Sequence, residues 1–326
     1  MKYLLFALLG MGLCIPTVHA RPVSYPGGWT LMLMNDGDKN SAHIHYSPTA
    51  KMSLGYKFEH WRDKALNLHA IQMNNLLKRW NKKDSQANFY LKSGIGAAHS
   101  TSGASDDETA PAGFTGIALD WEDRRFFASY ENRYTYADGI DDFYTQSARV
   151  GVAPYIGNYG DLHTWLMLQI EHSPESEDHY TVTPMVRLFK DVHLFEAGMN
   201  TRGEVLFNYI FRYEFKSLRG NPMKKLILTT LAILLISTPQ SFASDNPIKD
   251  ITGDVFVSVN GLVCDFCARA LEKVFGKRDE VNAINVDLDK KIVTIDLKDG
   301  QTMEEETIKK LITDSGYNVE EVRYAE

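Results

Sequence analysis

A twelve-residue apolar run near the middle of the chain divides the sequence into two parts. The run, LILTTLAILLIS at 226–237, follows Met-Lys-Lys at 223–225 and precedes Ser-Phe-Ala at 241–243. As a helix it is about 18 Å long, which is short against a bilayer core of about 30 Å. A charged start, an apolar run and a small-x-Ala end make a signal peptide. We interpret residues 223–243 as a second signal-peptide-like segment, with a short anchoring helix between two domains as the alternative.

The same pattern opens the chain. Residues 1–20 begin with Met-Lys, continue through an apolar run at 4–15 and end in Val-His-Ala, which predicts a signal peptide. Leu13 stands where a lipoprotein signal needs Gly or Ala, which disfavours a lipid on Cys14. Because a signal peptide works at a nascent N-terminus, two of them indicate two exported proteins joined end to end. The predicted products are 21–222 and 244–326.

Composition supports this division. All five Trp, all ten His and 31 of the 37 aromatic residues precede residue 223.

The chain has 326 residues and a formal net charge of −7. A general nucleic-acid binder would carry a basic face, so we expect no nucleic-acid partner.

The first part shows period-2 alternation in several segments of about ten residues. In the segment 205–215, every second residue is apolar or aromatic, from Val205 to Phe215, and Asn208, Arg212 and Glu214 fall between them. A soluble sandwich explains alternation alone, but long strands, aromatic strand ends and an export signal together favour a membrane barrel. The end at Phe215 resembles the last-strand signal of Gram-negative outer-membrane barrels. We predict an all-β transmembrane barrel of about 10–12 antiparallel strands over residues 21–222.

The predicted lumen contains soft metal ligands. Met32 and Met34 share one strand face, and His43 and His45 share a face of the next strand. Thioethers and imidazoles suit Cu(I), whereas the plainer interpretation is that Met fills gaps and His joins other polar groups. A third possibility, an ester hydrolase acting on lipid, needs a His, a Ser and an acidic residue, and no spacing singles out such a set.

The second part predicts a β-α-β-β-α-β order. Strands are expected at 255–259, 281–288, 292–297 and 317–324. One helix follows the first strand, and another begins at a capping-box pair, Thr302 and Glu305, and stops at Gly316. This order is the α+β, ferredoxin-like split βαβ arrangement.

Two cysteines follow the first strand of this part. Cys264 and Cys267 are three residues apart at a predicted helix start, where the helix dipole favours thiolate over thiol. Residues 244–326 contain no other Cys and no His, whereas a structural zinc site needs four ligands. Two thiolates alone suit a soft ion such as Cu(I) or Hg(II). Thiol–disulfide exchange is the alternative use of this spacing.

Residues 254–324 resemble the heavy-metal-associated domain family, which includes periplasmic mercury-binding proteins and copper chaperones. The family pattern Gly-Met-x-Cys-x-x-Cys corresponds to 261–267 here, with Leu262 in place of Met, and Phe266 is bulkier than usual. The resemblance implies Cys264 and Cys267 as metal ligands. It places Gly261, Leu262 and Tyr317 near the metal.

These features together predict envelope proteins that handle a soft metal. We expect Cu(I) first, with Hg(II) or another soft metal possible, and binding and transfer rather than enzyme catalysis. The expected partners are outer-membrane lipid for the first part, and a metal-transporting membrane protein or other metal carrier for the periplasmic second part. The alternative is a periplasmic thiol–disulfide oxidoreductase joined to a structural barrel, which the lack of any proline after Pro247 disfavours.

The two-product interpretation makes a prediction about processing. If 223–243 is removed as a signal peptide, the second product begins at Ser244. Intact-mass measurement of the mature products from the native cell should show this N-terminus. A single polypeptide that contains both parts would contradict the prediction.

Overall fold

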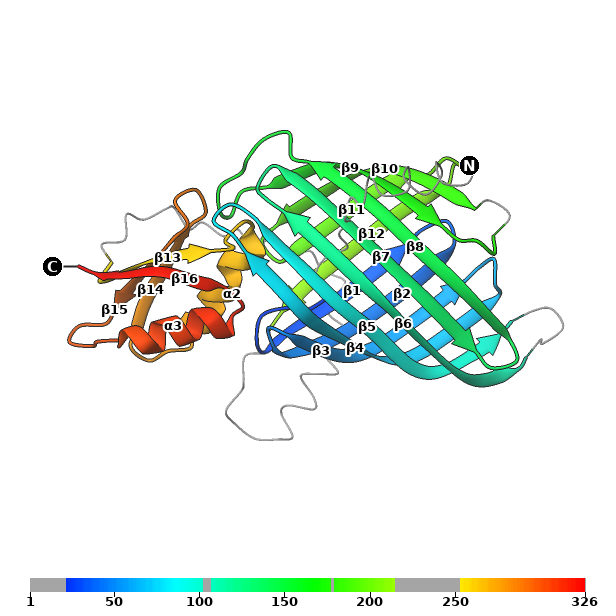
Figure 1. Cartoon of the computed structure of the whole chain (residues 1–326), viewed down its shortest axis with the longest axis horizontal. Coiled ribbons are helices and arrows are strands. Elements are labelled where there is room, and N and C mark those ends of the chain that lie inside the picture. The colour runs from blue at the N-terminus through cyan, green and yellow to red at the C-terminus, as the bar shows by residue number, and fades with distance from the viewer. Residues whose placement is uncertain (1–21, 102–106, 177–178, 215–252, 326) are drawn as a thin grey trace, which may run out of the picture.

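The computed structural model describes residues 22–101, 107–176, 179–214 and 253–325, which form a β-barrel and a smaller α+β domain at one end of it (Figure 1). Both signal-peptide-like segments and Phe215 lie outside the described residues.

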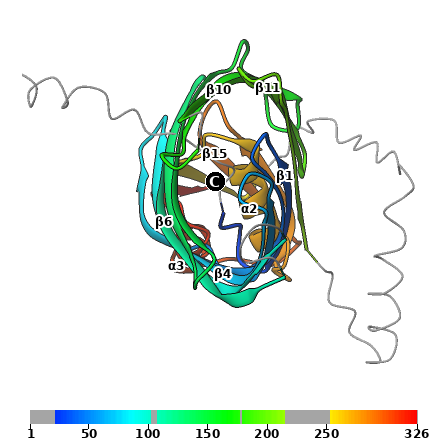
Figure 2. The same cartoon turned by 90° about the vertical axis from the view of Figure 1, so that its right-hand side faces the viewer.

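The described residues of the first part form twelve strands. Their bounds are β1 Gly28–Asn35, β2 Lys39–Thr49, β3 Met52–Trp61, β4 Leu66–Asn81, β5 Gln86–Ser100, β6 Thr109–Glu122, β7 Phe126–Ala137, β8 Asp141–Val152, β9 His163–His172, β10 Tyr180–Lys190, β11 His193–Met199 and β12 Val205–Tyr213. Each strand pairs antiparallel with its neighbours in sequence, and β1 pairs with β12 to close the barrel. Figure 2 looks along the barrel and shows its closed outline. The predicted barrel is confirmed, at the upper end of the expected strand number.

The barrel is apolar outside and polar inside. The apolar residues of the strands face outward, and two examples are Ile95, which is 77% exposed, and Val205, which is 62% exposed. The alternate positions point inward, so that Arg149, Gln169 and Asn208 are buried. This reverses the usual arrangement of a water-soluble protein, in which charged residues face the solvent.

Charged groups in the lumen neutralise one another across strands. Glu196 on β11 accepts from Arg149 at 3.0 Å and from Arg187 Nε at 2.7 Å, and Asn208 Nδ2 donates to its second oxygen at 2.7 Å. A second group joins Glu59 to Lys57 and Arg133, each at 2.7 Å. A buried charge is tolerated when it is paired and hydrogen-bonded in this way.

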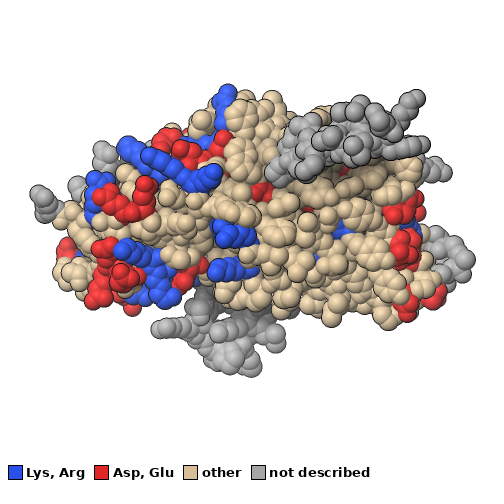
Figure 3. All heavy atoms as spheres, in the orientation of Figure 1, with Lys and Arg blue, Asp and Glu red and all other residues tan. Residues whose placement is uncertain are grey.

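Aromatic side chains gather near both ends of the barrel. Trp29 packs against Tyr46 and Tyr213 where β1 begins and β12 ends, and Tyr136 and Tyr180 are exposed at the opposite end. Between the ends, the face of the barrel in Figure 3 is largely uncharged, and charges are concentrated on the second domain and the far edge. Aromatic girdles around an apolar band are typical of transmembrane barrels.

The second domain has the predicted element order. It consists of β13 Val255–Asn260, α2 Asp265–Phe275, β14 Val281–Asp287, β15 Ile292–Leu297, α3 Glu305–Asp314 and β16 Asn318–Tyr324. The sheet order is β14-β15-β13-β16, with antiparallel pairing throughout. The core lies between the sheet and the helices, and includes Val257, Leu271, Phe275, Ile295 and Ile308. Neither described helix is long and apolar enough to cross a bilayer.

One local expectation is wrong. The helix α3 begins at Glu305 with Glu304 as its N-cap, and no side chain caps it by a hydrogen bond. The expected capping-box pair of Thr302 and Glu305 is therefore absent. Met303 is buried instead and accepts a hydrogen bond from Tyr324 through its carbonyl oxygen, so tertiary contacts hold this segment outside the helix.

The Glu196 cluster yields a test of barrel stability. Glu196→Gln removes the charge that two buried arginines share, and we expect a loss of about 3 kcal/mol, because an unpaired buried charge is left behind. Equilibrium unfolding in urea, followed by tryptophan fluorescence, measures the change. The control Glu108→Gln, at an exposed position outside the lumen, should leave the unfolding midpoint unchanged. Equal stability of both variants would contradict the role of the cluster.

Candidate metal centre

The two cysteines lie where the loop after β13 turns into α2. Cys264 is the N-cap of the helix, with extended backbone, and Cys267 lies in the first turn. The Cys267 amide donates to the Cys264 carbonyl at 2.9 Å, and this hydrogen bond joins the end of the loop to the first turn of the helix. Gly261 starts the loop with φ of +91°, a conformation that side chains other than glycine rarely adopt.

The geometry brings the two sulfurs to one point. The Sγ atoms are 3.2 Å apart, and both residues are reduced thiols. A thiolate lies about 2.3 Å from a bound zinc ion, so two sulfurs on opposite sides of a similar ion are about 4.6 Å apart. A modest opening of the pair admits such an ion. Among the described residues, no group of three or more His, Cys, Asp or Glu side chains is placed to hold a metal.

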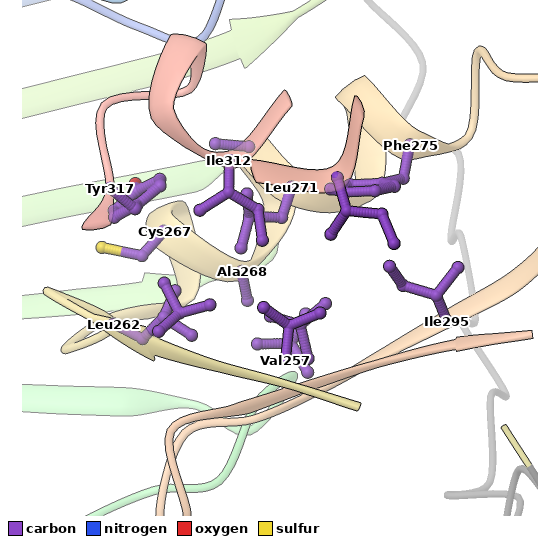
Figure 4. Close-up of a cluster of buried hydrophobic side chains, with 14 of the residues drawn as sticks. Val257, Leu262, Cys267, Ala268, Leu271, Phe275, Ile295, Ile312 and Tyr317 are labelled. Carbon is purple, nitrogen blue, oxygen red and sulfur yellow. The ribbon is translucent and has the colours of Figure 1, made fainter. Parts of the chain in front are cut away.

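The predicted neighbours surround Cys267. Leu262 and Tyr317 are buried in the same core cluster, and Figure 4 shows them on either side of Cys267, whose sulfur points away from Leu271 and Phe275. A Schellman motif at the end of α3 positions Tyr317. The Gly316 amide donates to the Thr313 carbonyl at 2.9 Å, and the Tyr317 amide donates to the Ile312 carbonyl at 3.2 Å.

The lumen residues predicted as soft ligands are brought together by the β1–β2 pairing. Met32 faces His43 directly in the register, and all four residues line a cavity of about 20 Å³. Within the described part of the chain, Nε2 of His43 and Nε2 of His45 are buried without a hydrogen-bond partner. Lys92, Arg149 and Glu196 line the same cavity, and Glu196 is already paired with Arg149 at 3.0 Å, which leaves the positive charge of Lys92 to oppose a cation there. The assignment of Met32, Met34, His43 and His45 as ligands stays a prediction.

The residues between the cysteines contact the barrel. Asp265 is fully buried, its Oδ1 lies 2.8 Å from His163 Nε2, and its Oδ2 accepts from the Gly160 amide at 2.9 Å. Cys264, Asp265 and Phe266 line a cavity of about 60 Å³ together with His163 and Phe189 of the barrel. Sequence reasoning did not foresee these contacts, since a single sequence gives no measure of which distant segments meet. The bulk of Phe266 was the one available signal.

Comparison with known proteins separates the two parts. The heavy-metal-associated domain matches residues 256–318. The copper chaperone CopZ of Staphylococcus haemolyticus (strain JCSC1435) is 36% identical over 63 residues, which are 19% of this chain and 91% of the relative.

Solved structures resemble the barrel. The KdgM porin in complex with disordered oligogalacturonate has 13% identity and a TM-score of 0.36, and it covers 58% of this chain and 99% of its own. LpxR from Salmonella typhimurium has 7% identity and a TM-score of 0.32, with 58% and 100% covered. At these identities and TM-scores the likeness carries no further conclusion about this chain.

The chaperone match is different in kind, because it spans nearly the whole relative at more than a third identity. The family match at residues 256–318 includes Cys264 and Cys267. Through residues 256–318, the chain belongs to the heavy-metal-associated domain family.

Proposed function

We propose that the C-terminal domain binds Cu(I) between Cys264 and Cys267 and passes it to a metal-transporting membrane protein or another carrier in the periplasm. The observation that carries the proposal is the pair of sulfurs 3.2 Å apart at the start of α2. A two-thiolate site is selective for soft ions and leaves room for an incoming ligand. Transfer then proceeds by ligand exchange, so the activity is binding rather than catalysis. Hg(II) fits the same donor set.

The barrel is proposed to span the outer membrane of a Gram-negative cell. Its support is the exposed apolar exterior, the charged lumen and the closure of the sheet. In lipid, every backbone polar group must be satisfied within the protein, and a closed barrel meets that requirement.

The competing function for the cysteine pair is thiol–disulfide exchange. Sulfurs 3.2 Å apart could also form a disulfide after a small movement. Against it, the ferredoxin-like order of elements differs from that of thioredoxin-like enzymes, and residues 248–326 contain no proline.

Copper binding is tested on residues 244–326, which contain a complete hydrophobic core. Anaerobic titration against a competing Cu(I) chelator should give one ion per domain. Cys264→Ser and Cys267→Ser should each lower affinity about 100-fold or more, since one thiolate cannot hold the ion in two-coordinate geometry.

The matched control is Tyr317→Phe, which keeps the ring beside Cys267 and should retain the parent affinity. Far-ultraviolet circular dichroism should show that all variants stay folded without metal, because the core is independent of the cysteines. Copper binding by the double cysteine variant as tight as the parent's would overturn the site. Rapid catalysis of disulfide exchange by the parent would favour the redox alternative.

The membrane assignment predicts detergent-dependent folding. Residues 21–222 should fold in detergent micelles to a β-rich species whose electrophoretic mobility shifts on boiling. Deletion of 205–213 should abolish the shift, because β1 and β11 would lose their common partner and leave unpaired edges. A monomeric, water-soluble form without detergent would contradict the assignment.

A further inference from the structure

We infer that the end of the barrel where β1 begins and β12 ends is a docking site for the metal-binding domain of this same chain, and that Asp265 and Phe266 are its docking residues. We call this end the proximal rim. It consists of the strand connections 50–51, 82–85, 123–125, 153–162 and 191–192 together with the adjoining strand ends. The occupant is the domain at 253–325.

Phe266 is the apolar anchor of the contact. Its ring lies 4.1 Å from that of Phe189 on β10, and the Arg212 guanidinium lies 3.9 Å from the Phe266 ring. A cation over an aromatic face is attracted to the ring, more strongly when water is excluded. A large apolar side chain exposed to water in a metal-binding loop is unfavourable. Contact with Phe189 and Arg212 at the proximal rim removes part of the Phe266 ring from water.

Asp265 is the polar anchor. In an isolated domain a carboxylate at the start of a helix would face water, whereas here Asp265 has no exposed surface. The barrel provides both of its partners from the β8–β9 connection and the start of β9, namely the Gly160 amide and the His163 imidazole. The Gly160 amide hydrogen-bonds Oδ2, whereas Oδ1 lies close to His163 Nε2 without hydrogen-bond geometry. These two groups give the contact specificity, because a surface without them would leave the buried carboxylate with no partner.

Charge pairs surround the two anchors. Arg269 on α2 pairs with Asp191, Arg124 pairs with Asp289, and Lys277 pairs with Glu214. In each pair one partner belongs to the barrel and the other to the domain. Tyr159 also donates to Glu272, and burial raises the pKa of both groups. Opposite charges therefore meet across the contact at these three places.

The backbones also approach closely at the two glycine turns beside the metal site. The Gly261 amide donates to the Lys82 carbonyl at 2.9 Å, and Asn81 Nδ2 donates to the Gly316 carbonyl at 3.0 Å. A Cβ at Gly261 would come within 2.3 Å of Asn81 Oδ1, and one at Gly316 within 2.3 Å of Arg79 Nη1. A larger residue at either turn would displace the Asn81 or Arg79 side chain, and the positive φ of both residues favours glycine independently of the barrel.

Docking has a consequence for the cargo. Cys264, one of the two proposed ligands, lines the 60 Å³ cavity between the domain and the barrel together with His163. An ion bound to Cys264 would lie beside the rim of the barrel, which covers part of the approach to the site. We therefore expect slower metal exchange from the docked domain than from the undocked domain. This consequence rests on the proposed copper binding, whereas the docking itself does not.

The test is photo-cross-linking without copper. Residues 21–326, refolded in detergent with residues 223–243 intact, carry a benzophenone amino acid in place of Phe266. Irradiation should join position 266 to barrel peptides that contain Phe189 or Arg212. The control carries the same group in place of Tyr324, which is exposed at the end of β16 furthest from the barrel (Figure 1), and should give no such product.

Charge reversal makes the test specific. Asp191→Arg should lower the yield about tenfold, because it places like charges at Arg269, and addition of Arg269→Asp should restore it. Yields at 266 no higher than at 324, or a double variant as poor as the single, would each overturn the docking. The Cys264→Ser/Cys267→Ser variant should cross-link like the parent, so failure of copper binding and failure of docking are distinguishable.

Discussion

The pairing of β1 with β12 is the contact on which the rest of the structure depends. Without it the sheet would have two edges of unpaired backbone groups. Closure also turns a period-2 alternation into an inside and an outside. It brings Arg149 of β8 within 3.0 Å of Glu196 on β11, although these strands are not neighbours in the sheet. The buried charges are thus satisfied only because the sheet curves back on itself.

Closure with an even number of antiparallel strands also places both ends of the barrel at the rim that the second domain contacts. Both ends of the barrel chain are at the proximal rim, so the chain leaves toward the second domain from that side. The groups that contact the domain come in part from the strand connections at this rim. Gly160 and Asp191 come from two of these connections, and each meets a residue of α2. The topology of the barrel therefore selects the surface that the metal-binding loop meets.

The sequence predicts the elements of this protein well and their long-range contacts poorly. Alternation identified the segment around β12, with Asn208 and Arg212 inward, because side-chain period is a local property of a strand. Spacing and helix position likewise brought Cys264 and Cys267 together. The start of α3 was misplaced, since the burial of Met303 outweighed a local capping preference. The sequence does not predict the partners of Asp265, because His163 is about a hundred residues away in the chain and no local pattern relates the two.

The start of α2 separates metal binding from docking by helix geometry. Successive side chains turn by about 100°, so residues three apart point within about 60° of each other. Cys264 precedes the helix as its extended N-cap, and from there its sulfur meets that of Cys267 in the first turn. Asp265 and Phe266 fall on the remaining faces, where they contact the barrel without competing for the ion. The two positions between the ligands can therefore change partner specificity while the donor set stays constant. This explains why a metal-binding loop can carry a bulky aromatic residue and a buried carboxylate at positions that do not ligate metal.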